Sequence, residues 1–256
     1  MVGVQYPLYR IRAAKVDQCR TSMRPSPVAA RYLRNMCGRF TLSQSPERVA
    51  EAFGLTEVPE FPPRYNIAPS QPVGVILQNR DSGAREFRLM VWGLIPAWVK
   101  DPSKFANLIN ARSETAAEKP SFRAAYKYRR CLIPADGFYE WQKVKSGSKQ
   151  PFLFTVGDRS LFAFAGLWES WNDIETCTIL TTAANPLLRT VHDRMPVILN
   201  PEDYARWLDP TPREPQQLSG LLQPFPDKSM QAISVSTRIN FAKVDDAQCI
   251  EPLQAS

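Results

Sequence analysis

The segment Thr176–Thr181, which reads Thr-Cys-Thr-Ile-Leu-Thr, is a short run of β-branched and apolar residues that favours a β-strand. Similar β-branched or aromatic runs recur along the chain, at Val73–Gln78, Phe87–Ile95, Phe138–Val144, Phe152–Val156, Leu161–Trp168 and Ala232–Ser236. Turn residues such as Asp81-Ser82-Gly83 separate several of them. Cys37–Leu42 predicts one further short strand. We therefore expect a fold that rests on β-sheet.

Helical signals are fewer. Ser45-Pro46-Glu47 predicts a helix with a serine N-cap and proline in its first turn, and Gly54 predicts its end. Further helices are expected at Ser113–Tyr126, Pro201–Leu208 and Pro215–Leu222. Strands outnumber helices and do not alternate with them, which indicates an α+β fold with a largely antiparallel, barrel-like sheet and peripheral helices. The chain shows no internal repeat, so residues 36–256 are predicted to form one domain.

The positive charge is concentrated at the start of the chain. The 256 residues include 32 Lys and Arg against 25 Asp and Glu, a net charge of +7. Residues 1–35 hold seven basic residues and one acid, which is +6 of this total. They show no sustained periodicity and no apolar core of a secretory signal. We expect a disordered basic leader, a transit peptide, or a coding sequence whose true start is Met36.

Cysteine and histidine content excludes several kinds of site. The five cysteines form no Cys-x-x-Cys pair, and His192 is the single histidine, so zinc sites with two or more histidines are excluded. We expect no metal, no cofactor and no membrane span, and a cytoplasmic protein in reducing surroundings.

Cys37 follows Met36 directly, and removal of Met36 would make it the first residue. An N-terminal cysteine carries an amine and a thiol on adjacent carbons. The amine can condense with an aldehyde, and the thiol can then close a five-membered thiazolidine. With a pKa of about 7.7–8.0, roughly 10–17% of such an amine is unprotonated at pH 7. The alternative is a buried structural thiol.

Other candidate residues carry acid–base groups. Glu140 lies among aromatic residues in a predicted strand, with Phe138 on its own face and Tyr139 and Trp141 on the other. Desolvation there would raise its pKa, as a general acid needs, whereas a solvent-facing strand glutamate is the alternative. Histidine is the side-chain type suited to proton transfer near neutral pH, and His192 would share a face with Arg194 in an extended segment; a structural histidine is the alternative.

Polar and aromatic residues elsewhere suggest nucleic-acid contacts. Asn110 and Arg112 would share one face of an extended segment, where Asn110 could orient a nucleophile and Arg112 could hold a phosphate. A capped turn with a surface arginine is the alternative. Most of the six tryptophans are expected in the core. Trp98 follows Pro96 in a loop and is the tryptophan we expect to be exposed for base stacking.

Six sequence blocks occur in a characteristic order, and together they resemble the SOS-response-associated peptidase (SRAP) family of abasic-site processing proteins. The blocks are Met36-Cys37-Gly38-Arg39-Phe40, Arg64-Tyr65-Asn66-Ile67-Ala68-Pro69, Trp92-Gly93-Leu94-Ile95-Pro96, Asn110-Ala111-Arg112-Ser113-Glu114-Thr115, Gly137-Phe138-Tyr139-Glu140-Trp141 and His192-Asp193-Arg194-Met195-Pro196.

The resemblance implies a DNA-damage response enzyme that senses abasic sites in single-stranded DNA. It implies that Cys37 forms a thiazolidine crosslink with the lesion, that Asn110 positions the cysteine amine and the sugar, that Glu140 moves protons, and that His192 assists at the opened sugar. It further implies phosphate and base contacts, at Arg39, Trp98, Arg112, Trp141 and Arg194.

The resemblance also implies that Cys37 needs a free amine, supplied by a start at Met36, by a protease or by self-cleavage. Autoproteolytic and strand-cleaving lyase activities are further expectations. Capture of one lesion needs only a monomer. We expect the protein to be associated with the nucleoid if its source is bacterial. The alternatives from the residues are a cysteine peptidase that acts on proteins and a non-covalent single-strand-binding module.

Overall fold

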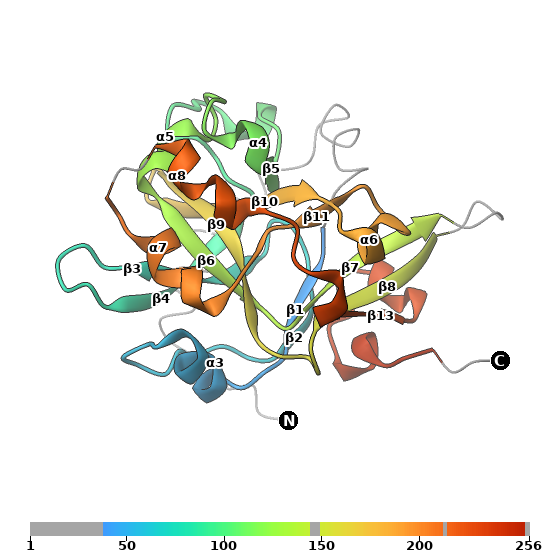
Figure 1. Ribbon diagram of the computed structural model, residues 1–256. Coiled ribbons are helices and arrows are strands. Elements are labelled where there is room, and N and C mark those ends of the chain that lie inside the picture. The colour runs from blue at the N-terminus through green and yellow to red at the C-terminus, as the bar shows by residue number, and fades with distance from the viewer. Residues whose placement is uncertain (1–37, 144–148, 212–213, 254–256) are drawn as a thin grey trace.

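Two β-sheets form the centre of the protein in the computed structural model, which describes residues 38–143, 149–211 and 214–253 (Figure 1). The larger sheet contains β3 (Pro72–Gln78), β4 (Arg85–Trp92), β5 (Asn110–Arg112), β6 (Arg130–Ala135), β9 (Phe162–Trp171), β10 (Ile174–Ala183), β11 (Arg194–Pro196) and β12 (Ile198–Leu199). The smaller sheet contains β13 (Met230–Ser234), β8 (Lys149–Val156), β7 (Gly137–Lys143), β1 (Phe40–Leu42) and β2 (Arg64–Ile67), in that spatial order.

The larger sheet closes on itself. The strands β10, β4, β3, β6 and β9 follow one another, and β9 pairs again with β10. Four of these pairings are antiparallel, and the pairing of β10 with β4 is parallel. Closure into a barrel removes the free edges that an open sheet would expose. The predicted α+β fold with a largely antiparallel barrel is confirmed.

Aromatic side chains join the two sheets into one core. The Phe40 ring lies 5.2 Å from that of Trp92 and 5.7 Å from that of Phe164, so β1 packs on strands of the barrel. Phe138 of β7 lies 6.0 Å from Phe164. The strands that carry the first and fifth sequence blocks are therefore fastened to the barrel by buried rings.

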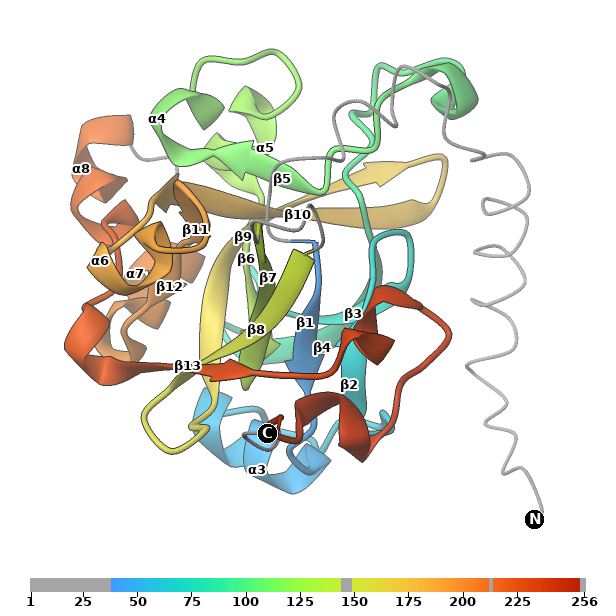
Figure 2. The same cartoon turned by 90° about the vertical axis from the view of Figure 1, so that its right-hand side faces the viewer.

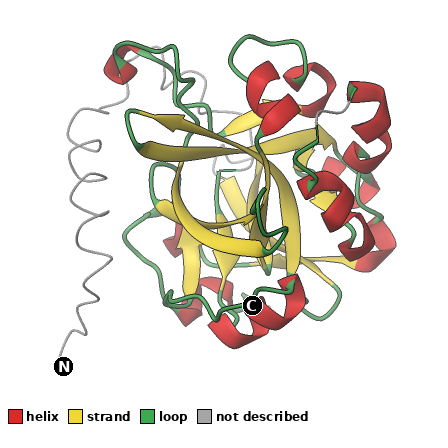
Figure 3. Ribbon diagram, turned by 90° about the vertical axis from the view of Figure 1, so that its left-hand side faces the viewer, coloured by secondary structure: helices red, strands yellow, loops and turns green. Residues whose placement is uncertain are grey.

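Short helices surround the sheets (Figures 1 and 3). The α-helices are α3 (Pro46–Phe53), α4 (Ser113–Ala116), α5 (Arg123–Tyr128), α6 (Pro186–Arg189), α7 (Tyr204–Leu208) and α8 (Pro215–Ser219). The 3₁₀-helices are η1 (Pro102–Lys104), η2 (Pro201–Asp203), η3 (Gly220–Leu222), η4 (Asp227–Ser229), η5 (Thr237–Asn240) and η6 (Ala247–Ile250). None of the helices in the described part of the chain has the length and apolarity that a membrane crossing requires.

The helix α3 follows its predicted caps. The Ser45 side chain accepts a hydrogen bond from the Arg48 amide, and Pro46 occupies the first turn. Gly54 ends the helix in the left-handed region, at φ 62°, and its N–H donates to the carbonyls of Ala50 and Glu51. Local sequence therefore determines both ends of this helix.

Four predicted elements have wrong boundaries or the wrong helix type. The helix expected over Ser113–Tyr126 is divided into α4 and α5, because Pro120 in between has no N–H to donate and blocks a continuous helix. The strand expected over Phe87–Ile95 ends at Trp92, since the next residue, Gly93, has φ 135°. The helices expected from Pro201 and to Leu222 each contain a 3₁₀ turn.

Candidate functional site

The described part of the site begins at Gly38, because Cys37 lies outside the described residues. β1 pairs antiparallel with β7, with Phe40 opposite Phe138. The pairing continues toward the start of the chain, where the Tyr139 amide donates to the Arg39 carbonyl at 3.0 Å. The same register sets Gly38 opposite Glu140. The residue bonded to Cys37 is therefore a cross-strand neighbour of the predicted proton carrier.

Glu140 is a buried acid on β7. The strand alternates as predicted, since Phe138 belongs to the main core whereas Tyr139 and Trp141 pack in a second cluster. Glu140 is 4% exposed, and its Oε1 accepts no hydrogen bond within the described residues. Desolvation raises the pKa of this carboxyl to about 8. At pH 7 the group therefore carries a proton that it can donate.

Asn110 lies on β5, beside β10. β5 pairs parallel with β10, with Asn110 opposite Ile179, and the Asn110 side chain is buried. The residue before this strand, Ile109, is held by the core, because the buried Trp92 Nε1 donates to its carbonyl at 2.8 Å. The extended segment expected at Asn110 and Arg112 is confirmed, and Arg112 is exposed at its end.

His192 lies in the turn between α6 and β11, because the strand starts only at Arg194. The extended arrangement considered for His192 and Arg194 is therefore wrong. The His192 amide donates to Leu188 O at 2.8 Å, and its ring Nδ1 accepts from the Arg194 amide at 3.0 Å. The same Nδ1 lies 3.2 Å from the Arg194 carbonyl oxygen and 3.2 Å from the Asp193 carboxylate. The turn itself thus holds the imidazole in one orientation.

Two side-chain contacts connect the elements that carry these residues. Gln142 of β7 donates from Nε2 to the Thr190 carbonyl at 3.1 Å, which joins the Glu140 strand to the His192 turn. Arg194 donates to both carboxylate oxygens of Glu114, at 2.6 and 2.8 Å, and to Thr181 O. Glu114 lies two residues after Arg112, which is the last residue of β5. The β7, β5 and His192 segments are therefore linked directly.

The predicted DNA-binding residues fall into two groups. Arg112 and Trp98 are exposed, and the Trp98 side chain packs edge-on against Phe105 with its ring centre 5.5 Å away. The other three have partners within the protein. Arg39 donates to Asn66 Oδ1 at 2.8 Å and to the Ile239 carbonyl, Trp141 Nε1 donates to Asn240 Oδ1 at 2.7 Å, and Arg194 is held by Glu114.

Sequence reasoning assigned no role to four of the residues in these contacts: Asn66, Glu114, Gln142 and Asn240. Asn66 and Glu114 stand inside the second and fourth sequence blocks, which was the available signal. Gln142 and Asn240 carried no signal, because their partners are distant in the chain.

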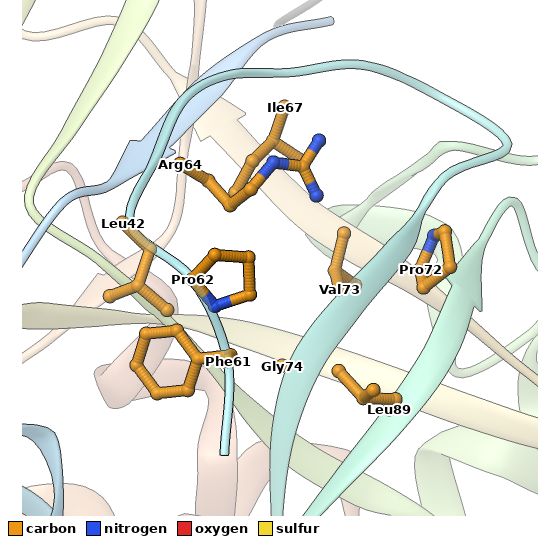
Figure 4. Close-up of a pocket in the computed structure, with 9 residues that line it drawn as sticks. All are labelled: Leu42, Phe61, Pro62, Arg64, Ile67, Pro72, Val73, Gly74 and Leu89. Carbon is orange, nitrogen blue, oxygen red and sulfur yellow. The ribbon is translucent and has the colours of Figure 1, made fainter. Parts of the chain in front are cut away.

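Other features of the described residues do not add a second site. Cys131, Cys177 and Cys249 are buried, and burial raises the pKa of each thiol, which makes them poor nucleophiles. The described residues contain no group of three or more metal-ligating side chains. A small pocket beside β3 is lined mostly by apolar side chains and includes none of the predicted catalytic residues (Figure 4).

The chain resembles known proteins along most of its length. It is 45% identical over 224 residues to the abasic site processing protein YoqW of Bacillus subtilis, covering 84% of this chain and 99% of that one. It is 30% identical to the abasic site processing protein HMCES of Gallus gallus, covering 86% and 78% of the two chains. A crystal structure of a protein from Bacteroides thetaiotaomicron superimposes with a TM-score of 0.76 at 27% identity, covering 85% of this chain and all of that one.

The family model of the SOS response associated peptidase (SRAP) matches residues 36–242, which span all six ordered blocks as well as β1, β5 and β7. Together with the closed barrel and the linked segments around Glu140, this match establishes that the chain belongs to the SOS response associated peptidase family.

Proposed function

We propose that this protein processes abasic sites in single-stranded DNA by forming a covalent bond through Cys37. The observation that carries the proposal is Glu140, a buried acid with a pKa of about 8, opposite the residue bonded to Cys37. The relatives named as abasic site processing proteins support the same substrate.

The proposed reaction starts from the ring-opened abasic sugar, which has an aldehyde at C1′. The free amine of Cys37 adds to C1′, and the resulting carbinolamine loses its hydroxyl as water to form an imine. The thiol sulfur then adds to the imine carbon, and the thiol proton moves to nitrogen. One water is released, no oxidant or reductant is consumed, and the product is a thiazolidine.

Three residues supply the acid–base steps. Glu140 donates the proton with which the carbinolamine hydroxyl leaves, for which a neutral carboxyl at pH 7 is suited. Asn110 orients the amine and the sugar from β5. His192 hydrogen-bonds the oxygen freed by ring opening. Loss of a C2′ proton from the imine would instead break the strand by β-elimination, which is the proposed lyase activity.

The DNA strand is proposed to contact Arg39, Arg112 and Arg194 through phosphates and Trp98 and Trp141 through bases. Arg112 and Trp98 are exposed and offer immediate contacts. For Arg194, a phosphate would have to share or replace the Glu114 carboxylate. These five side chains would account for the affinity for single-stranded DNA and for its dependence on salt concentration.

The amine of Cys37 must be free for this chemistry, and the family match begins at Met36. We propose that residues 36–256 form the catalytic domain and that Cys37 is exposed by a start at Met36, by a protease or by self-cleavage. In self-cleavage the Cys37 thiol would attack the Met36 carbonyl, and the Met36–Cys37 amide bond would break as a proton passes to the freed amine. Water would then hydrolyse the thioester, releasing residues 1–36 and restoring the thiol, with Glu140 and His192 moving protons. Intact mass of freshly expressed protein tests the last route, because a species that still begins at Met1 and does not crosslink would exclude self-cleavage.

A denaturing gel tests the crosslink. Protein expressed from Met36 is incubated with an oligonucleotide that has one abasic site, and a heat-stable shifted band is expected. Cys37→Ser keeps the amine but has a hydroxyl in place of the thiol, so it should form a shifted band only when borohydride reduces the imine. No band with either protein would contradict covalent capture.

The same preparation tests the two alternatives. Hydrolysis of unrelated peptides that depends on Cys37, without a crosslink to DNA, would assign the protein as a peptidase. Strongly salt-dependent binding of intact single strands without any crosslink would assign it as a non-covalent binding module.

A further inference from the structure

Phe241 has the largest exposed fraction of the exposed large hydrophobic side chains in the described part of the chain. It is 69% exposed, compared with 59% for Trp98 and 54% for Val58. It directly follows η5 (Thr237–Asn240), in the segment that lies against the small sheet next to β2 (Figure 2). An aromatic ring left in water gains nothing from the hydrophobic effect, so packing does not explain its position.

The backbone beneath this ring is firmly held. The side-chain amide of the buried Asn66 lies 3.1, 3.2 and 2.7 Å from the carbonyl oxygens of Ile239, Phe241 and Val244. The Asp245 carboxylate accepts the backbone amide of Asn66 at 2.9 Å. Hydrogen bonds therefore fix the chain before, at and after Phe241, and the ring projects from a support that needs no reordering on binding.

The same segment touches the proposed active site. Arg39, which follows Gly38, donates to the carbonyls of Ile239 and Asn240. Trp141, which follows Glu140, donates to the Asn240 side chain at 2.7 Å. Phe241 is bonded to Asn240. The exposed ring is therefore one residue away from Asn240, whose backbone carbonyl accepts from Arg39 and whose side chain accepts from Trp141.

A positively charged residue, Lys243, follows Phe241 by two residues in the chain. Lys243 is exposed and forms no ion pair with another described residue. The nearby acids are occupied, since Asp245 pairs with Arg64 and Asp246 pairs with Arg238. An exposed aromatic ring with a free cation nearby is the arrangement that single-strand-binding grooves use.

We propose that Phe241 is a stacking platform for an unpaired base that neighbours the lesion, an inference that rests on the proposed function. An abasic site removes one base from the stack, so the adjacent base has an uncovered face. The Phe241 ring can cover that face, and Lys243 can accompany the adjoining phosphate. The contact is indifferent to base identity, because every base presents a π-face.

The test compares Phe241→Ala, Phe241→Leu and Phe241→Trp, with Val58→Ala as the control for loss of an exposed apolar side chain. The full chain is titrated with a labelled single strand that contains a stable abasic analogue unable to crosslink. Phe241→Ala and Phe241→Leu should each weaken binding about 5- to 150-fold, the range expected for one lost stack. Phe241→Trp should bind at least as tightly as the unaltered chain, and Val58→Ala should bind equally.

Because Phe241 is exposed, these changes should leave the thermal midpoint unaltered, so a weaker affinity cannot be attributed to unfolding. Equal affinity of the Ala variant and the unaltered chain would overturn the proposal, as would full affinity of the Leu variant, which indicates apolar contact without stacking. Crosslinking by otherwise unaltered protein expressed from Met36 is measured in parallel. If it crosslinks while Phe241→Ala binds normally, only the platform fails; if it neither binds nor crosslinks, the proposed function fails as well.

Discussion

Arg194 is bound by both carboxylate oxygens of Glu114, 80 residues earlier in the chain, while its own backbone amide donates to the ring of His192. One residue therefore connects an internal ion pair to the orientation of the imidazole. The carboxylate also occupies the same bidentate face that a phosphate would use.

Removal of the Glu114–Arg194 ion pair should have opposite effects on DNA binding and on the rate of crosslinking. Glu114→Ala should free Arg194 for phosphate and tighten single-strand binding, with a salt slope steeper by about 0.7. The same change should slow crosslinking at saturating DNA, because the His192 turn loses an anchor. Affinity titrations over a salt series and single-turnover crosslinking measure the two effects.

Glu118→Ala is the matched control for this change. It removes the same charge from an exposed residue shortly after α4, so it should leave the rate of crosslinking unaltered. Weaker DNA binding by Glu114→Ala would show that Arg194 does not receive a phosphate.

Burial of Glu140 predicts a specific pH dependence of stability. Desolvation raises its pKa from 4.5 to about 8, so the folded chain holds this proton over a pH range in which the unfolded chain has lost it. The contribution is full below 4.5 and is lost as pH rises to about 8, with a slope of at most about 1.4 kcal/mol per pH unit. Glu140→Gln stays neutral, so urea unfolding should show its stability gaining on that of the unaltered chain as pH rises.

The same variant should lose crosslinking, by a factor on the order of 10²–10⁴, because an amide cannot donate the proton. A stability difference that is constant from pH 5 to pH 8 would contradict the raised pKa, whatever the activity.

The buried Asn66 predicts a local loss of order. Asn66→Ala removes the side-chain amide that the carbonyls of Ile239, Phe241 and Val244 share, and should cost about 1–3 kcal/mol in the free energy of unfolding. Hydrogen exchange should show the loss of protection concentrated in residues 239–245. Asn200→Ala changes an exposed asparagine without a capping hydrogen bond and serves as the control. Uniform loss of protection across the barrel would contradict this role.

Trp92 provides a test of how β5 is positioned. Trp92→Phe keeps most of the buried ring but removes the donor to Ile109 O, next to Asn110, and should destabilise the chain by about 1–3 kcal/mol. Crosslinking should slow by more than unfolding explains under conditions where the variant is fully folded. Trp98→Phe, at an exposed position, should leave urea unfolding unaltered. A Trp92→Phe variant that crosslinks at the normal rate would show that Asn110 does not depend on this contact.

The sequence predicts those parts of the fold that are determined locally. The caps of α3 and the strands β3, β7 and β8 follow from capping residues and from runs of β-forming residues. By contrast, β5, β11 and β12 have only two or three residues each. Such strands exist because a neighbouring strand supplies their hydrogen bonds, and no periodic pattern fits into so short a segment.

The candidate site likewise has some features that local sequence predicts and others that depend on the fold. Aromatic neighbours on one strand suggested a desolvated Glu140, with a solvent-facing glutamate as the alternative, and the structure shows that the side chain is buried. The partners of Arg39 and Arg194 lie up to 201 residues away in the chain, so their engagement within the protein had no local signal. Residue type predicted that these arginines could bind phosphate. Only the fold determines which groups of the protein are their hydrogen-bond partners.

The position of β1 has a mechanical consequence. This strand is hydrogen-bonded on both sides, by β2 and by β7. If DNA is joined at Cys37 as proposed, a pull on the DNA in the direction of β1 would reach the protein through this strand. The hydrogen bonds to both neighbours would then be loaded together in shear instead of opening one at a time, so a motor pulling on the strand would meet an anchor that resists extraction.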